Sequence, residues 1–189
     1  IRPLANAPPK VSFYRRDVTA PLDDLFQAHR PQGVVHLAFR LRPSHDRESV
    51  RRVNVGGTAN VLRACAAVGV QQVLYMGSTT VYGAHPDNPV PLTEEAPLRP
   101  VKGFHYSEDK VAAEGLLREH AAAHPEVCLT VLRGCVVMGP TAENFITAAL
   151  EKPVLVGVAG HDPPMQFIHE DDQAAVLLHL LEHPRAGVY

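Results

Sequence analysis

Three side chains with acid–base chemistry lie close together in the sequence. The stretch QQVLYMGS (residues 71–78) is typical of a strand that ends at Ser78, and HYSEDKVAAEGLL (residues 105–117) of a helix that carries Tyr106 and Lys110. Residues four apart share one face of a helix, so the phenol and the ammonium can both reach a ligand above the strand end. A hydroxyl, a phenol and an ammonium at one place can move a proton to or from a carbonyl or carbinol oxygen.

Alternating strands and helices must position these side chains. We predict strands at residues 11–14, 33–38, 73–76, 127–133, 154–158 and 166–169, and helices at residues 21–29, 47–68, 106–124, 144–150 and 171–182. Residues 33–38 form a continuous apolar run, typical of a strand covered on both faces. The alternation predicts an α/β fold with a doubly wound parallel sheet, in which ligands bind outside the carboxyl ends of the strands.

Composition and charge exclude several classes of protein. The 189 residues are 46% apolar and 20% charged, with a formal net charge of −2, which argues against broad binding to nucleic acid or to membrane surfaces. No apolar run is long enough to span a bilayer, and residues 1–10 hold three prolines and lack the apolar segment of a signal peptide. We therefore expect a cytoplasmic protein.

Cysteine and histidine do not indicate a metal site. Cys65, Cys128 and Cys135 are odd in number, widely spaced and embedded in apolar segments, as expected for reduced core residues. The eleven histidines are scattered singly and form no HExxH pattern. We expect no bound metal.

Seven patches of sequence resemble the extended short-chain dehydrogenase/reductases, the NAD-dependent epimerase/dehydratase group that includes UDP-galactose epimerase. They are Arg16-Asp17-Val18, Val35-His-Leu-Ala38, Asn54-Val-Gly-Gly-Thr58, Ser78-Thr-Thr-Val-Tyr-Gly83, Tyr106-Ser-Glu-Asp-Lys110, Leu132-Arg133 with Met138-Gly-Pro140, and Phe167-Ile-His-Glu-Asp-Asp172. The resemblance implies a partial Rossmann-like dinucleotide-binding domain at residues 1–140. Residues 141–189 would be part of a small substrate-binding region whose last helix returns to the Rossmann core.

The resemblance also implies NAD or NADP as cofactor. Asp17 would accept a hydrogen bond from the adenine amino group beside the Val18 backbone, although a turn cap would also explain an aspartate there. Residues 37–41 would wrap the phosphates and the nicotinamide ribose. The expected cofactor contacts on this and the neighbouring elements are Leu37, Ala38, Phe39, Arg40, Asn54, Ser78, Tyr106, Lys110 and Cys135. Leu37 and Ala38 could also belong partly to the core, and Asn54 could be a solvated or bridging residue.

The same resemblance assigns the chemistry to Ser78, Tyr106 and Lys110. Tyr106 would exchange a proton with the substrate while hydride moves to or from nicotinamide. Its free pKa near ~10 is too high for a base at neutral pH, and Lys110 would favour the phenolate. Ser78 would hold the substrate oxygen, with Thr79, Thr80 and Asn144 as further substrate contacts. Ser78 could instead cap the strand end, and Asn144 could equally cap a helix.

Departures from the family pattern bear on the substrate. The sequence contains no Gly-x-x-Gly-x-x-Gly turn, so we expect the first β-α-β unit to lie outside it. Met165 stands where sugar-nucleotide enzymes of the family usually carry an arginine for the diphosphate, and Val136 where an asparagine often contacts the sugar nucleotide. Thr79 and Thr80 replace the acid pair of the sugar 4,6-dehydratases, which argues against dehydration by this chain.

Three functional hypotheses remain open at this point. The first is an NAD(P)-dependent epimerase or dehydrogenase that acts on a sugar or sugar nucleotide. The second is an NAD(P)H-dependent reductase or dehydrogenase of a non-phosphorylated ketone or alcohol, and the third is a non-catalytic dinucleotide sensor. The family also leads us to expect a homodimer paired through helices 47–68 and 106–124.

Overall fold

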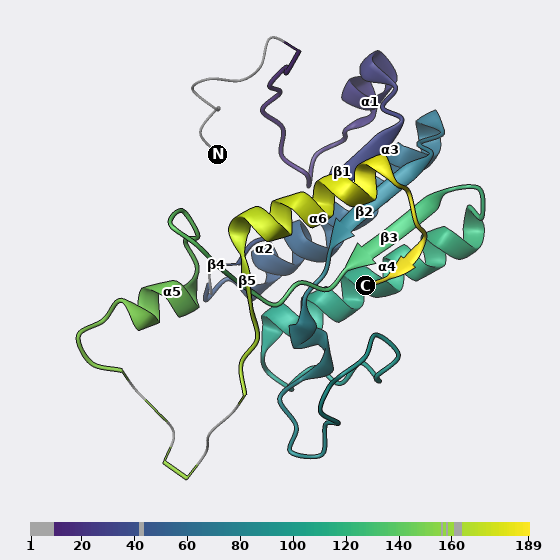
Figure 1. Ribbon diagram of the computed structural model, residues 1–189. Helices are drawn as coiled ribbons and strands as arrows, with labels where there is room; N and C mark the ends of the chain where they lie inside the picture. The colour runs from purple at the N-terminus through teal and green to yellow at the C-terminus, as the bar shows by residue number, and fades with distance from the viewer. Residues whose placement is uncertain (1–9, 42–43, 156, 158, 161–163) are drawn as a thin grey trace.

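A parallel sheet forms the centre of the protein. The computed structural model describes residues 10–41, 44–155, 157, 159–160 and 164–189 (Figure 1). The main sheet contains β1 (Gly33–His36), β2 (Gln72–Met76), β3 (Cys128–Leu132) and β6 (Gly187–Val188), in the order β1-β2-β3-β6, and every neighbouring pair is parallel. The predicted α/β fold with a parallel sheet is confirmed.

Helices cover both faces of this sheet. On one face, α1 (Asp23–His29), α3 (Gly57–Val68) and α4 (His105–Ala123) pack in the larger hydrophobic core. On the other face, α6 (Glu170–Glu182) crosses the sheet and buries Leu180 (Figure 1). Side chains alternate along β2: Val73 and Tyr75 belong to the first core, and Leu74 and Met76 to the second. Residues 73–76 of β2 are thus apolar because both faces of the strand are covered.

A small second sheet lies beyond the carboxyl end of β3. It pairs β4 (Val136–Met138) with β5 (Phe167–His169) in parallel, and the short helix α5 (Phe145–Leu150) lies between these strands in the sequence. The division at residue 140 into a cofactor domain and a substrate region stays a prediction.

The helical run predicted at residues 47–68 is interrupted by one wide turn. It consists of α2 (Arg47–Arg51), the π-helix η1 (Arg52–Gly56) and α3. Asp46 caps its start by accepting a hydrogen bond of 2.9 Å from the Ser49 backbone N–H. Gly69 ends it in the left-handed region at φ 72°, as predicted. The sequence pattern did not reveal the π-helix, which falls at Asn54.

Several predicted elements differ from the structure. Residues 11–14 form no strand: they pair with none of the described strands, and Val11, Phe13 and Tyr14 stay exposed. The strand at residues 33–38 was expected to be covered on both faces, but Val34 and Val35 are only half-buried. Residues 156 and 158, part of the strand predicted at residues 154–158, lie outside the described residues. The short strands β4 and β6 were not predicted.

No helix in the described part of the chain combines the length and hydropathy needed to cross a membrane.

A buried histidine ties β1 to α3. His36 is 4% exposed, and its Nε2 lies 3.0 Å from the Thr58 hydroxyl oxygen. That hydroxyl donates to the Asn54 carbonyl at 2.6 Å, so its oxygen accepts from His36 Nε2–H. Burial lowers the pKa of His36 to about 4, with a smaller effect in the same direction from Lys110.

The free energy of unfolding should therefore fall as the pH drops from about 6.5 towards 4. In that window the unfolded chain binds a proton at His36 that the folded protein does not, so the stabilisation present at pH 7 is lost, by up to about 3 kcal/mol. Urea unfolding at pH 7 and pH 5 measures this change. His36→Leu should be less stable at pH 7 but show a smaller drop between the two pH values. An equal drop in both proteins would contradict the assignment.

Candidate active site

Ser78 lies directly beyond the carboxyl end of β2, at the start of the 3-10 helix η2 (Thr79–Tyr82). Its backbone is extended, and its Oγ accepts hydrogen bonds from the Thr80 backbone N–H at 3.3 Å and the Thr80 hydroxyl at 3.0 Å. The Ser78 hydroxyl thus acts as a cap, which is the alternative role that we considered for it from the sequence. Because both contacts use the oxygen as acceptor, the hydroxyl hydrogen stays available to donate to a neighbour or a ligand.

Lys110 is a buried cation held against the end of β2. Only 3% of the residue is exposed, and its Nζ donates to the Met76 carbonyl at 2.6 Å. The Nζ also lies 3.9 Å from the centroid of the Phe39 ring and 4.8 Å from that of Tyr75, positions that favour cation–π attraction. Burial lowers the pKa of Lys110 to about 7, opposed by the negative charge of Glu114.

Tyr106 lies one helical turn before Lys110, in the first turn of α4. The Lys110 Nζ is 5.8 Å from the Tyr106 ring centroid, and the Phe39 ring meets Tyr106 edge-on at 5.6 Å. Burial raises the pKa of the phenol, while a hydrogen bond with the Ser78 side chain acts in the opposite direction. The structure therefore brings the three predicted catalytic side chains together at one strand end; their catalytic role stays a prediction.

Both carboxylates next to Lys110 on α4 are paired with arginines. Asp109 accepts from Arg51 Nη1 at 3.0 Å, and Glu114 from Arg133 Nη2 at 2.7 Å. The side chains of Glu114 and Arg133 are only 4% and 7% exposed, so this pair is buried. Because each acid has its own arginine, Lys110 has no carboxylate in hydrogen-bonding contact within the described residues. Its ammonium remains free to interact with a phenolate or a ligand oxygen.

Residues 37–41 follow β1 and border the same strand edge. Leu37 is 55% exposed and Ala38 is also exposed. The alternative that these two residues belong partly to the core is therefore wrong. Phe39 turns inward beneath Lys110, whereas the Arg40 side chain is exposed and its Nη1 lies 3.4 Å from the Ser49 hydroxyl. Leu37 is thus an apolar side chain exposed directly after the carboxyl end of β1.

Asn54 is fully buried in η1 and uses its whole amide within the protein. Its Oδ1 accepts from the Arg40 backbone N–H at 2.7 Å, and its Nδ2 donates to Asp109 Oδ2 at 3.1 Å. This is the bridging role that the sequence left open. Asn54 would therefore affect a cofactor only indirectly, by holding residues 37–41 in place.

Asp17 and Val18 occupy a turn against α3. Asp17 Oδ1 accepts from the Thr19 backbone N–H and hydroxyl, both at 2.9 Å, so it caps a turn, and these contacts lower its pKa. The Val18 carbonyl accepts from Asn60 Nδ2 at 2.8 Å. A Cβ on Gly57 would lie 2.7 Å from Val18 Cγ2, so glycine allows this close approach of the turn to α3.

Of the predicted substrate contacts, Thr79 and Thr80 lie in η2 beside Ser78, whereas Asn144 lies at the start of α5. Thr80 bonds Ser78, and the Thr79 backbone N–H donates to the Gly134 carbonyl at 3.0 Å, which ties η2 to the end of β3. Cys135 follows there, half-buried, and burial raises the pKa of its thiol.

Asn144 caps α5. Its Oδ1 accepts from the backbone N–H groups of Ile146 and Thr147 at 3.0 and 3.1 Å, and its Nδ2 donates to the Val137 carbonyl at 2.8 Å. Since all its side-chain polar atoms are used, the helix-cap alternative describes this residue, and direct substrate contact stays an untested prediction.

Sequence reasoning missed two buried polar groups beside the site. Arg133 also donates to the Tyr82 hydroxyl at 2.8 Å, and a charged residue directly after an apolar strand was the available signal. Gln173 on α6 is 7% exposed, and its amide N and O have no hydrogen-bond partner among the described residues. A Cβ on Gly134 would lie 2.8 Å from Gln173 Oε1, so glycine allows this approach.

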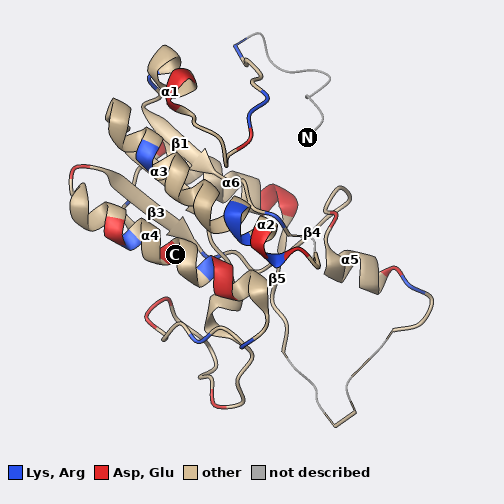
Figure 2. Cartoon of the chain, turned by 180° about the vertical axis from the view of Figure 1, so that it is seen from behind, with Lys and Arg blue, Asp and Glu red and all other residues tan. Residues whose placement is uncertain are grey.

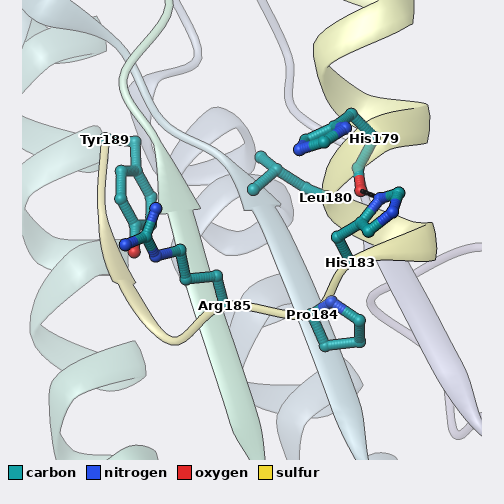
Figure 3. A pocket seen from close by; sticks show the side chains of 6 residues that line it. All are labelled: His179, Leu180, His183, Pro184, Arg185 and Tyr189. Atoms are coloured by element: carbon teal, nitrogen blue, oxygen red, sulfur yellow. Dashed lines mark hydrogen bonds between the residues drawn. The ribbon is translucent and has the colours of Figure 1, made fainter.

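A cavity of about 450 Å³ lies at the opposite edge of the sheet. It is lined by His179, Leu180, His183, Pro184, Arg185 and Tyr189 (Figure 3). These residues belong to the end of α6 and the segment leading into and through β6, so they face away from the carboxyl ends of the strands. The cavity is therefore separate from Ser78, Tyr106 and Lys110.

Known proteins share both the sequence pattern and the fold. The profile of the NAD dependent epimerase/dehydratase family matches residues 2–189. The chain is 29% identical over 188 residues to UDP-glucose 4-epimerase of Erwinia amylovora, covering 86% of this chain and 55% of that protein. It is 26% identical over 184 residues to the uncharacterized protein Rv0501 of Mycobacterium tuberculosis, covering 95% of this chain and 49% of that protein.

A solved structure agrees with these sequence matches. The Bordetella bronchiseptica enzyme WbmG, in complex with NAD and UDP, superposes with a TM-score of 0.72 at 26% identity, over 93% of this chain and 56% of that one. The chain spans about half the length of the curated relatives it matches. Together with the parallel sheet and the Ser78, Tyr106 and Lys110 cluster, the match over residues 2–189 establishes that the chain belongs to the NAD-dependent epimerase/dehydratase family of extended short-chain dehydrogenase/reductases.

Proposed function

We propose that the protein performs NAD(P)-dependent hydride transfer at a hydroxyl or carbonyl carbon of a sugar or sugar nucleotide, as an epimerase or dehydrogenase. The observation that carries this proposal is a buried Lys110 ammonium, free of any carboxylate contact within the described residues, one helical turn from Tyr106 and beside Ser78. Relatives named UDP-glucose 4-epimerase support a sugar nucleotide, and the WbmG complex with NAD and UDP supports both ligand classes.

The residues present fit the nicotinamide half of a dinucleotide. Lys110 presents an ammonium and Leu37 an apolar surface at the carboxyl edge of the sheet, which suits a ribose hydroxyl beside a flat ring. A bound nicotinamide supplies the hydride acceptor or donor. Its pyrophosphate would need a glycine-rich turn, which the 189 residues do not contain.

Each of the three side chains then has a defined task. Ser78 donates its hydroxyl hydrogen to the substrate oxygen and holds that oxygen near the Tyr106 phenol. Tyr106 takes the proton from a substrate hydroxyl, or returns one to a carbonyl oxygen. Lys110 stabilises the phenolate by its charge, and Phe39 and the Met76 carbonyl fix its ammonium in place.

A second candidate is a reductase or dehydrogenase of a non-phosphorylated ketone or alcohol. Met165 favours it, because this 52% exposed apolar side chain occupies the position where the family's sugar-nucleotide enzymes usually place an arginine. The protein should be incubated with NAD or NADP together with nucleotide sugars or simple ketones, with nicotinamide absorbance and products followed. Redox-neutral isomerisation supports the epimerase, and net cofactor turnover supports the second candidate. Cofactor binding without any reaction would support a sensor.

Replacing the phenol should separate chemistry from binding. Tyr106→Phe removes the proton-transferring hydroxyl but keeps the ring that packs against Phe39, so turnover should fall by about 10²-fold or more with little change in cofactor affinity. Tyr82→Phe is the matched control, since the Tyr82 hydroxyl bonds Arg133 outside the proposed proton path. Normal turnover in Tyr106→Phe would disprove the assigned base.

The pH dependence should report the proton shared by Tyr106 and Lys110. The active pair holds a phenolate and an ammonium, which is one proton fewer than the fully protonated pair. Because burial lowers the pKa of Lys110 to about 7, the pair loses its first proton near that pH. Below it, kcat/KM should fall about tenfold per pH unit.

In Lys110→Met the only remaining proton is that of the phenol, whose pKa burial raises. The acidic limb of the kcat/KM profile should therefore move to a pH above ~10. Exposed Lys102→Met is the control and should leave the profile unchanged. An acidic limb that stays near pH 7 in Lys110→Met would assign it to another group.

A further inference from the structure

A chain of buried hydrogen bonds joins the helix of Tyr106 and Lys110 to the loop at residues 37–41. Asp109 Oδ2 accepts from Asn54 Nδ2 at 3.1 Å, and Asn54 Oδ1 accepts from the Arg40 backbone N–H at 2.7 Å. Three elements distant in sequence, α4, η1 and the loop after β1, are thus connected through one amide. Asp109 itself lies directly before Lys110 in the sequence.

Because the connection is buried, each of its polar atoms needs its partner within the protein. Asn54 is 0% and Asp109 is 4% exposed, so an unpaired polar atom in either would have no water to replace its partner. Arg51 binds the second oxygen of Asp109 at 3.0 Å and fixes the orientation of the carboxylate. An acceptor-only carboxylate at position 109 obliges Asn54 to point its NH2 towards α4 and its oxygen towards the Arg40 N–H.

The loop held in this way shapes the environment of Lys110. Phe39 precedes Arg40, and its ring lies 3.9 Å from Lys110 Nζ and edge-on to Tyr106. The same loop exposes Leu37 at the carboxyl edge of the sheet. A displacement of the Arg40 backbone would therefore disturb the cation–π contact and the surface that borders the proposed nicotinamide.

We propose that Asp109 is a positioning residue that, through Asn54, holds residues 37–41 in the conformation that binds the dinucleotide. The cofactor part of this assignment rests on the proposed function. Within the described part of the chain, Asp109 makes no hydrogen bond to residues 37–41; it acts on them by orienting the Asn54 amide.

The neighbouring acid on α4 provides a contrast. Glu108 bonds Arg47 at 2.9 Å, the Gly103 backbone N–H at 3.0 Å and His105, and none of these contacts reaches Asn54 or the loop. Figure 2 shows that α2, which supplies both Arg47 and Arg51, carries charges of both signs along its length. Glu108→Gln is therefore a matched control for the loss of one α2–α4 ion pair without loss of the connection to the loop.

The test compares Asp109→Leu with a reciprocal exchange, Asn54→Asp combined with Asp109→Asn. Leucine removes the Asp109 acceptor, so the Asn54 NH2 keeps only its 3.5 Å contact with the Arg40 carbonyl and the amide is freed to turn. In the exchange, the new carboxylate at position 54 accepts from the Arg40 N–H and the new amide at position 109 donates to it, so the connection is rebuilt with reversed polarity. Hydrogen–deuterium exchange of residues 37–41 reports the loop, and titration with NAD(H) and NADP(H) reports affinity.

In Asp109→Leu, the amide hydrogens of residues 37–41 should exchange faster with deuterium. The variant should also bind the dinucleotide at least about tenfold more weakly. The reciprocal exchange should restore most of both properties, and Glu108→Gln should retain them. Unchanged loop exchange and affinity in Asp109→Leu, with only a lower melting temperature, would overturn the proposal, because that is the result of a purely structural residue. If a longer form of the protein that carries a glycine-rich turn binds no dinucleotide, the proposed function is wrong, while loop exchange still decides the positioning role.

Discussion

The arrangement of the site depends on one buried ammonium. Lys110 donates to the carbonyl at the end of β2 and lies over the Phe39 ring, but no carboxylate contacts it within the described residues. Removing an ammonium from water is costly, and one backbone carbonyl and two aromatic faces compensate for this only in part, which is why its pKa falls to about 7. A lysine in this state gains from any ligand or phenolate that supplies negative charge.

The surrounding charges keep Lys110 in this state. Asp109 and Glu114 lie one residue and one helical turn from it, and either could have neutralised it. Arg51 and Arg133 bind these two acids instead. The Glu114–Arg133 pair also joins α4 to the end of β3 and, through the Tyr82 hydroxyl, to η2. The ion pairs that hold the elements together are thus the same ones that leave the lysine available for chemistry.

Features that depend on a local sequence pattern could be predicted from the sequence. The apolar run of β2, the glycine that ends α3 and the spacing of Tyr106 and Lys110 each follow from a period or a turn preference, and the structure agrees with all three. Ser78 could be placed because a strand end is a local signal. The predicted strand at residues 11–14 failed because a strand needs a partner edge, and its β-branched and aromatic residues do not specify one.

Features that depend on tertiary contacts could not be predicted. Asn54 was expected to contact a cofactor, yet its amide is used by Asp109 and Arg40, residues 55 and 14 positions away. The π-helix that directs Asn54 inward has no sequence period of its own, and the pairing of Arg133 with Glu114 requires knowledge of which face of α4 meets β3. Charged residues at buried positions were visible in the sequence, but their partners were not.

The distribution of these interactions separates the chemistry of the site from its selectivity. Ser78, Tyr106 and Lys110 are fixed by buried contacts that would be the same for any alcohol or carbonyl substrate. The side chains expected to choose the substrate are held differently: Met165 is 52% exposed, and Asn144 is committed to the start of α5. The positive charge of Lys110 beside the Tyr106 and Ser78 hydroxyls would favour a substrate whose reacting carbon bears oxygen. Under the proposed function, discrimination among such substrates must come from residues other than Ser78, Tyr106 and Lys110.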